Sequence, residues 1–122
     1  MEQRGWILIP PAIWIVCIML IQILGAFTAP ASSEMPEECP EASRNCARMM
    51  MGLDGTPEEV HSVAMNWIDS QRRTEVEAQS ETASHTVFRT TWMLYPDDFF
   101  IQTGCTENGT WIQIHSDSRL GV

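Results

Sequence analysis

The chain has 122 residues, enough for one small domain, and it carries a formal net charge of −9 with no lysine. A surface of this sign repels phosphate backbones and anionic lipid headgroups. Nucleic acid is therefore excluded as an expected partner.

The first feature in chain order is an uncharged apolar segment over residues 6–29, WILIPPAIWIVCIMLIQILGAFTA. A membrane-spanning helix needs about 20 such residues, whereas the apolar part of a secretory signal has about 7–15. The length therefore favours an uncleaved membrane anchor. A cleaved signal is the alternative, because Ala29-Pro30-Ala31 has the small-x-small spacing of a cleavage site and Pro10-Pro11 interrupts a helix. Residues 1–31 are thus a signal anchor or a signal peptide.

The charges on either side of this segment predict its orientation. Arg4 precedes it, and the first charged residues after it are acidic, beginning with Glu34. The positive-inside rule then leaves the amino terminus in the cytoplasm. We expect the following domain on the extracytoplasmic side of a membrane, or secreted or periplasmic if the segment is cleaved.

Residues 32–55 are rich in proline, serine, glutamate and glycine, which predicts a linker. Cys39 and Cys46 in this linker most simply close a small disulfide ring in an oxidising compartment. Free thiols and a zinc site are the alternatives, but zinc usually needs four ligands and no CxxC motif is present, so we expect no metal. Cys105 is expected to join neither cysteine. The run 49–51 of three methionines is expected to cover the core rather than bind copper.

A helix is predicted over residues 57–72. Thr56 can cap its amino terminus, Pro57 suits its first turn, and Glu59 completes a capping box with Thr56. Apolar residues recur at steps of three and four and predict the face that packs on the core: Val60, Val63, Ala64, Trp67 and Ile68. His61 lies beside this face and is expected to be half-exposed.

After the helix the apolar period changes to two, which is typical of strands. Four short segments rich in β-branched and aromatic residues follow, over residues 74–80, 85–94, 98–104 and 110–116. We therefore expect an α+β domain over residues 56–122, in which one amphipathic helix packs on an antiparallel sheet of about four strands. Asn108 and the glycine after it predict a hairpin turn, and Asn108 also begins an acceptor for N-glycosylation if the host is eukaryotic.

Three motifs occur in order along the exported part: CPEASRNC, HTVFRTTWMLYPDDFF and IHSDSRLG. Together they resemble the domain of unknown function 1499 family, whose members run from a CP…NC loop through a helix to an FR(T/S) strand, an F-x-DD segment and a terminal strand with S-x-S-R-x-G. The resemblance assigns these motif positions: Cys39, Cys46, Arg89, Asp97, Asp98, Ser116, Ser118, Arg119 and Gly121. The cysteines enclose one residue more than in members, and members continue past the position of Val122. The family name implies no activity.

The polar residues of these motifs have two interpretations. Arg89 lies among apolar strands and needs a carboxylate partner, because an unpaired buried charge is costly; the first interpretation is a structural clasp with Asp97 or Asp98. The second is a site for a small polar or anionic ligand at one end of the sheet, since two arginines with hydroxyl groups suit a carboxylate or a phosphate. The residues of that site are Arg89, Asp98, His115, Ser116, Ser118 and Arg119.

Catalysis is the third hypothesis. Neighbouring side chains of a strand point to opposite faces, so neither Asp97 with Asp98 nor His115 with Ser116 readily shares one substrate. His85 is expected on the surface. No phosphate loop, nucleophile elbow, HExxH or haem-attachment motif is present, and no cofactor is expected.

The sequence thus predicts an extracytoplasmic module tethered to the membrane through residues 6–29, with a binding or structural role. The first alternative is an accessory subunit of a larger membrane complex, because Gln22, Gly25 and Ala26 suit packing against other helices. A small hydrolase-like enzyme is the second alternative.

Overall fold

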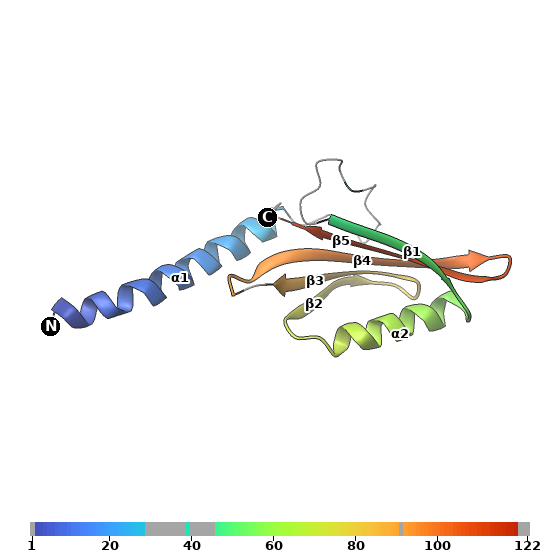
Figure 1. Ribbon diagram of the computed structural model, residues 1–122, viewed down its shortest axis with the longest axis horizontal. Helices are drawn as coiled ribbons and strands as arrows, with labels where there is room; N and C mark the ends of the chain where they lie inside the picture. The colour runs from blue at the N-terminus through green and yellow to red at the C-terminus, as the bar shows by residue number, and fades with distance from the viewer. Residues whose placement is uncertain (1, 29–38, 40–45, 91, 120–122) are drawn as a thin grey trace.

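The computed structural model describes residues 2–28, 39, 46–90 and 92–119, which form two helices and five strands (Figure 1). The elements in chain order are α1 Glu2–Phe27, β1 Cys46–Leu53, α2 Pro57–Asp69, β2 Thr74–Gln79, β3 Ala83–Thr90, β4 Tyr95–Thr106 and β5 Gly109–Ser118. This arrangement confirms the α+β class and the N-terminal apolar helix.

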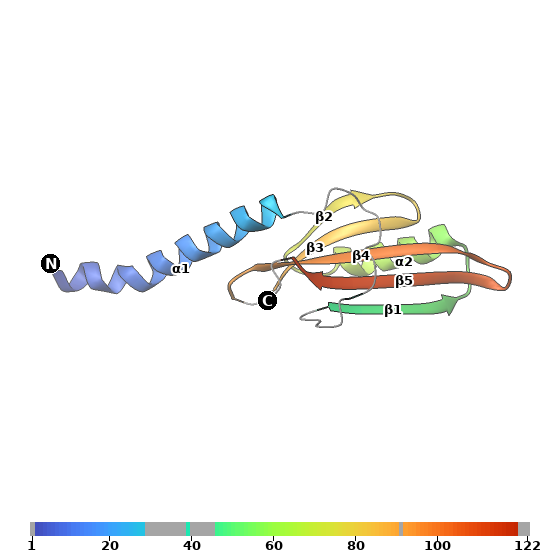
Figure 2. The same ribbon diagram turned by 90° about the horizontal axis from the view of Figure 1, so that it is seen from above.

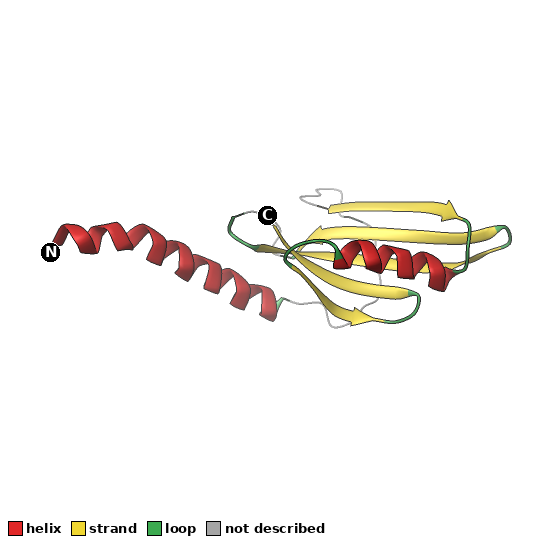
Figure 3. Ribbon diagram, turned by 90° about the horizontal axis from the view of Figure 1, so that it is seen from below, coloured by secondary structure: helices red, strands yellow, loops and turns green. Residues whose placement is uncertain are grey.

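The strands form one antiparallel sheet in the order β1-β5-β4-β3-β2. Strands β2 to β5 follow one another as a meander, and β1 pairs with β5 from Cys46, opposite Asp117, to Leu53, opposite Thr110. α2 lies across one face of the sheet (Figure 3). α1 leaves from one end of the sheet and continues along its long axis (Figure 1). The sheet therefore has a covered face towards α2, an opposite face, and one end at α1.

Strand β1 lies inside residues 32–55, which the sequence assigns to a linker, and it raises the number of strands from about four to five. The segment lacks the alternation of apolar and polar residues that indicates a strand, because three methionines stand in a row. Its extended form comes from backbone pairing with β5. Met49, Met50 and Met51 are exposed, so the prediction that they cover the core is wrong.

Helix α2 begins as the sequence predicts and ends earlier. Thr56 has extended backbone angles, and its side chain accepts a hydrogen bond from the Glu59 backbone N–H at 3.1 Å. The helix ends at Asp69 instead of residue 72, because both the backbone N–H and the hydroxyl of Ser70 donate to the Trp67 carbonyl. Arg73 then takes a positive φ of 58°, which turns the chain towards β2.

The core lies between α2 and the sheet. Its buried apolar side chains come from α2, β4 and β5: Val60, Met65, Ile68, Ile101 and Ile112. Val63 and Trp67 were predicted to belong to it, but they are 69% and 53% exposed. The Trp67 ring lies against Phe88 and Phe99 at centroid distances of 6.3 and 6.4 Å, at the border of the core.

His61 follows Val60 on α2 and is buried with it. It is 2% exposed, so the prediction that it is half-exposed is wrong. Its Nε2 has no hydrogen-bond partner among the described residues. Burial lowers the pKa of His61 below its ordinary value of 6.5, because the protonated ring would lose its hydration.

The hairpin between β4 and β5 forms where the sequence predicts it. Its two turn residues are Glu107 and Asn108, one position earlier than the pair Asn108 and Gly109. Gly109 is needed for close packing, since a Cβ atom there would lie 2.9 Å from the Leu53 carbonyl oxygen. Asn108 is exposed, as an acceptor for glycosylation must be.

We expect Ile68→Ala to lower the free energy of unfolding by about 2–5 kcal/mol, because Ile68 is fully buried in the core. Val63→Ala is the matched control, since Val63 is an exposed aliphatic residue on the same helix, and it should cost less than about 0.5 kcal/mol. Chemical unfolding of the purified protein in mild detergent measures both. Equal losses for the two variants would contradict the observed orientation of α2.

We expect the protein to lose stability as the pH falls below about 6.5, since the unfolded chain then binds a proton at His61 that the folded chain binds only at lower pH. His61→Gln removes this titration and should reduce the loss between about pH 8 and pH 5. The variant should keep part of this pH dependence, because burial also lowers the pKa of His115. An unchanged pH dependence in the variant would show that His61 does not contribute.

Candidate functional site

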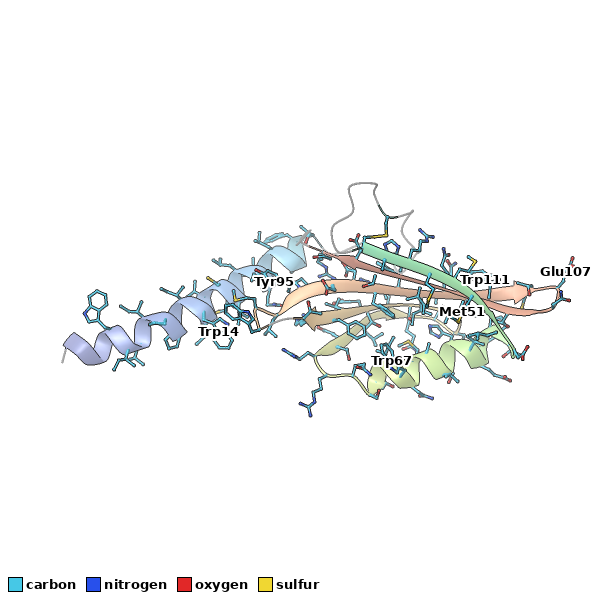
Figure 4. The ribbon with its side chains drawn as sticks, viewed as in Figure 1. Trp14, Met51, Trp67, Tyr95, Glu107 and Trp111 are labelled. Carbon is cyan, nitrogen blue, oxygen red and sulfur yellow. A yellow bond between two sulfur atoms is a disulfide. The ribbon has the colours of Figure 1, made fainter. Side chains whose placement is uncertain are left out.

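The candidate site lies on the sheet face opposite α2, at the end where α1 joins. Phe99 and Ile101 of β4 pack on the α2 side, so the alternating residues Asp98 and Phe100 point to the opposite side. The disulfide bond lies on this same side of the sheet (Figure 4). Both Asp98 and Phe100 are nevertheless buried.

Asp98 is the centre of the site. Arg119 donates to its carboxylate through Nη2 at 2.6 Å and through Nε at 3.1 and 3.2 Å, and His85 Nε2 lies 2.7 Å from Oδ1. Burial by itself raises the pKa of the Asp98 carboxyl group, but the hydrogen bonds and positive charges of His85 and Arg119 outweigh it and lower the pKa. The site therefore holds an ionised carboxylate at 4% exposure.

An aromatic layer continues from Asp98 across the sheet. The His85 ring stacks on Phe100 with centroids 4.4 Å apart and planes 7° from parallel, and His115 meets Phe100 edge-on at 6.2 Å. His85 is 3% exposed, so the prediction of a surface residue is wrong. The stack fixes the orientation of His85 towards Asp98.

His115 lies at the β1 side of this layer. Its Nε2 is 3.7 Å from Cys46 Sγ, and its Nδ1 has no hydrogen-bond partner among the described residues. Burial lowers the pKa of His115, the charge of Arg48 lowers it further, and Asp117 acts in the opposite direction. His115 is thus held neutral at ordinary pH.

Cys39 and Cys46 form the predicted disulfide, and Cys105 is free and exposed. The two sulfur atoms and a ring nitrogen of His115 lie within 4.8 Å of one another, a spacing that could suit a metal ion. Zinc binding requires thiolates, however, and the sulfur atoms are bonded to each other. In this oxidised form the group is a covalent tie between Cys39 and β1.

Arg119 connects the site to α1. Its Nη1 donates to the Gly25 carbonyl at 2.9 Å, and its backbone N–H donates to the Pro96 carbonyl at 3.1 Å. The last carbonyls of a helix lack partners within the helix, and a cation there also interacts favourably with the helix dipole. α1 has no basic residue in its own last turn. Arg119, the residue that directly follows β5, therefore supplies the cation.

Gly25 allows α1 to approach the sheet closely enough for this contact. A Cβ atom at this position would lie 3.0 Å from Pro96 Cγ and 3.8 Å from Arg119 Cδ. A larger residue would push the helix end away from β4. The small residue is therefore part of the junction.

Arg89 makes a second connection to α1. Its Nε donates to Gln22 Oε1 at 2.8 Å, and its Nη1 lies 3.4 Å from Glu75 Oε2. The Gln22 side-chain amide in turn donates to the Leu94 carbonyl at 2.8 Å. Gln22 thus joins β3 to the turn between β3 and β4.

The predicted clasp between Arg89 and an aspartate is wrong. Arg119 holds Asp98, and Asp97 accepts a hydrogen bond from the Thr90 hydroxyl at 2.9 Å. In the sheet register Arg89 pairs with Pro96, whereas Asp97 pairs with Phe88 and so points to the other face. The strand alternation therefore separates Arg89 from Asp97.

A cavity of about 280 Å³ lies between the end of α1 and the sheet. Its lining residues are Gln22, Gly25, Ala26, Glu77, Arg89, Pro96 and Arg119. The size suits a small polar molecule. Arg119 is already occupied by Asp98 and Gly25, so Arg89, whose side chain is 29% exposed, is the cation with more access to solvent.

The structure brings together only part of the predicted ligand site. Arg89 and Arg119 both line the cavity, and Asp98 lies behind Arg119. His115 is on the same face but pairs with Phe100, one pleat farther from α1 than Asp98. Ser116 and Ser118 lie on the opposite face, because they pair with Phe99 and Asp97.

Three residues of the observed site were not part of the predicted ligand site: His85, which was expected on the surface, and Gln22 and Gly25, which were expected to pack against other helices. The alternation along β3 places His85 on the face of Arg89, a signal that could have identified it. Gln22 is the only amide in the apolar segment after residue 5. Its partner on the sheet could not be found from the sequence, because 67 positions separate Gln22 from Arg89.

Comparison with protein-family models and with curated protein sequences adds no relative to this description. No family model matches the chain, and no curated protein sequence matches it. The resemblance to the domain of unknown function 1499 family therefore stays a prediction that depends on the three motifs.

We expect Asp98→Asn to lower the free energy of unfolding by about 3–5 kcal/mol, because it leaves the buried Arg119 without a counter-charge. Asp97→Asn is the matched control. Its amide oxygen can still accept from Thr90, and burial, together with the charges of Asp98 and Asp117, already raises the pKa of Asp97.

Unfolding of both variants at neutral pH in mild detergent measures the difference. Asp97→Asn should be close to neutral or stabilising, since it removes a carboxylate whose ionisation is disfavoured. A small effect at Asp98 together with a large one at Asp97 would show that the network around Arg119 is not the stabilising one.

Proposed function

We propose that this protein is a membrane-anchored extracytoplasmic module with a binding or structural role, and that α1 is its permanent anchor. Residues Gly5–Phe27 form a helical segment of 23 residues with a mean hydropathy of 2.5, long and apolar enough to cross a bilayer. A signal sequence passes the same test of length and composition. The choice between anchor and signal therefore depends on the contacts of α1.

The observation that carries the proposal is the pair of hydrogen bonds from the sheet arginines to α1. Arg89 donates to the Gln22 side chain and Arg119 donates to the Gly25 carbonyl. Removal of α1 would take away both acceptors. A helix that completes the hydrogen bonding of the mature domain is better explained as an anchor than as a leader that is cleaved off.

The disulfide and the charge pattern support an extracytoplasmic location for the domain. A disulfide between Cys39 and Cys46 suits an oxidising compartment, and Arg4 before the segment favours a cytoplasmic amino terminus. The hairpin tip with Glu107 is at the end of the sheet far from α1 (Figure 4). If the host glycosylates proteins, Asn108 beside it is well placed for modification away from the membrane.

The ligand part of the proposal concerns the cavity at the junction. Arg89 offers the accessible cation there, while Glu77 on the same wall disfavours a multiply charged anion. A small molecule with one carboxylate or a polar amide fits this charge balance. We infer that binding at this face uses Arg89 with Gln22 and does not use Ser116, which lies on the opposite face.

A role as an accessory subunit is the second candidate, and strand β1 favours it. β1 forms one edge of the described sheet, and Met49, Met50 and Met51 on it are exposed. An exposed apolar edge strand is a surface on which another chain can pair. The exposed sulfur-containing side chains would adapt to the surface of such a partner.

We expect the full-length protein to stay in the membrane pellet after alkaline carbonate extraction, and its intact mass to include α1. The control is a version in which residues 1–31 are replaced by a cleaved secretory signal, which should appear in the soluble fraction. A mass that begins after Ala29, with a soluble wild-type protein, would contradict the anchor. The same mass measurement reports the disulfide and any sugar on Asn108.

A further inference from the structure

The turn between β3 and β4 has a composition unlike that of the other hairpin turns. The segment 90–96, TTWMLYP, contains no charge and is bounded by Arg89 and Asp97. The hairpin turns at the far end of the sheet contain Glu81 and Glu107. Trp92 in the uncharged turn is 71% exposed, the largest exposed fraction of any tryptophan in the described domain after α1.

The turn between β3 and β4 lies beside α1. Figures 1 and 2, two perpendicular views, both show the tip between β3 and β4 reaching past the end of the sheet alongside the helix. Two hydrogen bonds fix its position. Trp14 Nε1 donates to the Trp92 carbonyl at 3.2 Å, and the Gln22 amide donates to the Leu94 carbonyl at 2.8 Å.

These contacts give the depth of the turn relative to the apolar segment, which ends at Phe27. At about 1.5 Å per residue, Gln22 lies about 8 Å inside that end and Trp14 about 20 Å inside it. The Trp92 carbonyl is therefore on the bilayer side of Gln22, within reach of the Trp14 side chain. The segment of 23 residues is about 35 Å long and the hydrocarbon core is about 30 Å thick, so Gln22 lies near the outer boundary of the core and the turn reaches into its outer half.

We propose that the turn at Trp92, Met93 and Leu94 inserts into the outer leaflet beside α1 and binds lipid acyl chains. The inference rests on the proposed function, because α1 must be in the membrane. A lipid occupant follows from continuity: between Trp14 and Gln22, at the depth of the turn, α1 exposes large apolar side chains, among them Ile15 and Met19, which a bilayer would cover.

The hydrogen bonds of the turn suit this environment. An irregular segment in a bilayer must satisfy its backbone carbonyls from within the protein, because lipid tails offer no donors. Trp14 and Gln22 are the α1 side chains that supply donors to the described part of the turn. Leu94 has a positive φ of 57°, the left-handed conformation of a tight turn, and its carbonyl accepts the hydrogen bond from Gln22.

Electrostatics agree with acyl chains rather than headgroups as the ligand. The chain has a net charge of −9, so anionic headgroups would repel the domain. Aromatic side chains such as Trp92 and Tyr95 are enriched at membrane interfaces because they combine an apolar ring with a polar group. The turn therefore adds apolar contact to an anchor of a single helix.

The test places a nitroxide label at the turn in full-length protein reconstituted into vesicles of a zwitterionic phosphatidylcholine. The labelled variant is Trp92→Cys in a background in which the free cysteines Cys17 and Cys105 are serine and the disulfide is intact. The matched control is Glu107→Cys at the opposite hairpin tip. Trp92 contacts α1 through its backbone carbonyl, so the side-chain change preserves that bond.

We expect relaxation by a water-soluble nickel chelate to be several-fold weaker at position 92 than at position 107, with relaxation by oxygen stronger at 92. Equal nickel accessibility at the two positions would overturn the inference by placing the turn in water. Low accessibility to both reagents at position 92 would also overturn it, since that result indicates burial in protein.

A measurement on the unaltered protein covers the case in which Trp92→Cys does not fold. Photoactivatable diazirine acyl chains in the same vesicles should label residues 92–95 in addition to α1, and adducts confined to α1 would overturn the inference. Carbonate extraction separates the two proposals. An extractable protein refutes the anchor, whereas a membrane-integral protein with an unlabelled turn refutes only the insertion.

Discussion

The buried carboxylate of Asp98 is the interaction on which the arrangement of this protein depends. An ion in the interior loses its hydration, and only several donors in good geometry compensate for that loss. Arg119, directly after β5, and His85 of β3 provide them from either side of β4. Because the donors come from different strands, the three strand ends must keep their register for the charge to be tolerated. The stack of His85 on Phe100 adds a steric reason for the same register.

The same arginine carries this constraint from the sheet to the helix. Arg119 uses Nε and Nη2 for Asp98, which leaves Nη1 directed at the Gly25 carbonyl. The planar guanidinium fixes these directions relative to one another, so the position of Asp98 determines where the end of α1 can bind. Gly25 provides the space against Pro96 that the approach requires. The orientation of the domain relative to the apolar helix is thus determined by the interior of the sheet, and the bond between Gln22 and Arg89 supports it from a second strand.

The periodicity of apolar residues in the sequence was sufficient to predict the fold class but not the candidate site. The capping residues, the period of two after residue 73 and the hairpin at Asn108 are local signals, and each predicted its element to within a few residues. Strand β1 was missed because its extended form depends on pairing with β5, more than 50 positions away. The exposed position of Val63 was missed because an apolar stripe on a helix indicates a face but not the exact rotation against the sheet.

For the candidate site, the alternation of side chains along a strand correctly separated Asp97 from Asp98. The choice between Arg89 and Arg119 as the partner of Asp98 required the strand order, which no local pattern contains.

Membrane anchoring and ligand binding at the candidate site both depend on the junction between α1 and the sheet. The cavity at the junction has walls from both α1 and the sheet, with Gln22 on one side and Arg89 on the other. It exists only while the helix is docked, and the helix is docked through groups that Asp98 orders from inside the sheet. A domain without α1 would keep the buried network around Asp98 but would lose one wall of the cavity and the acceptor of Arg89 Nε. A binding activity at this junction therefore belongs to the membrane-bound protein, and its absence from a soluble fragment would not argue against it.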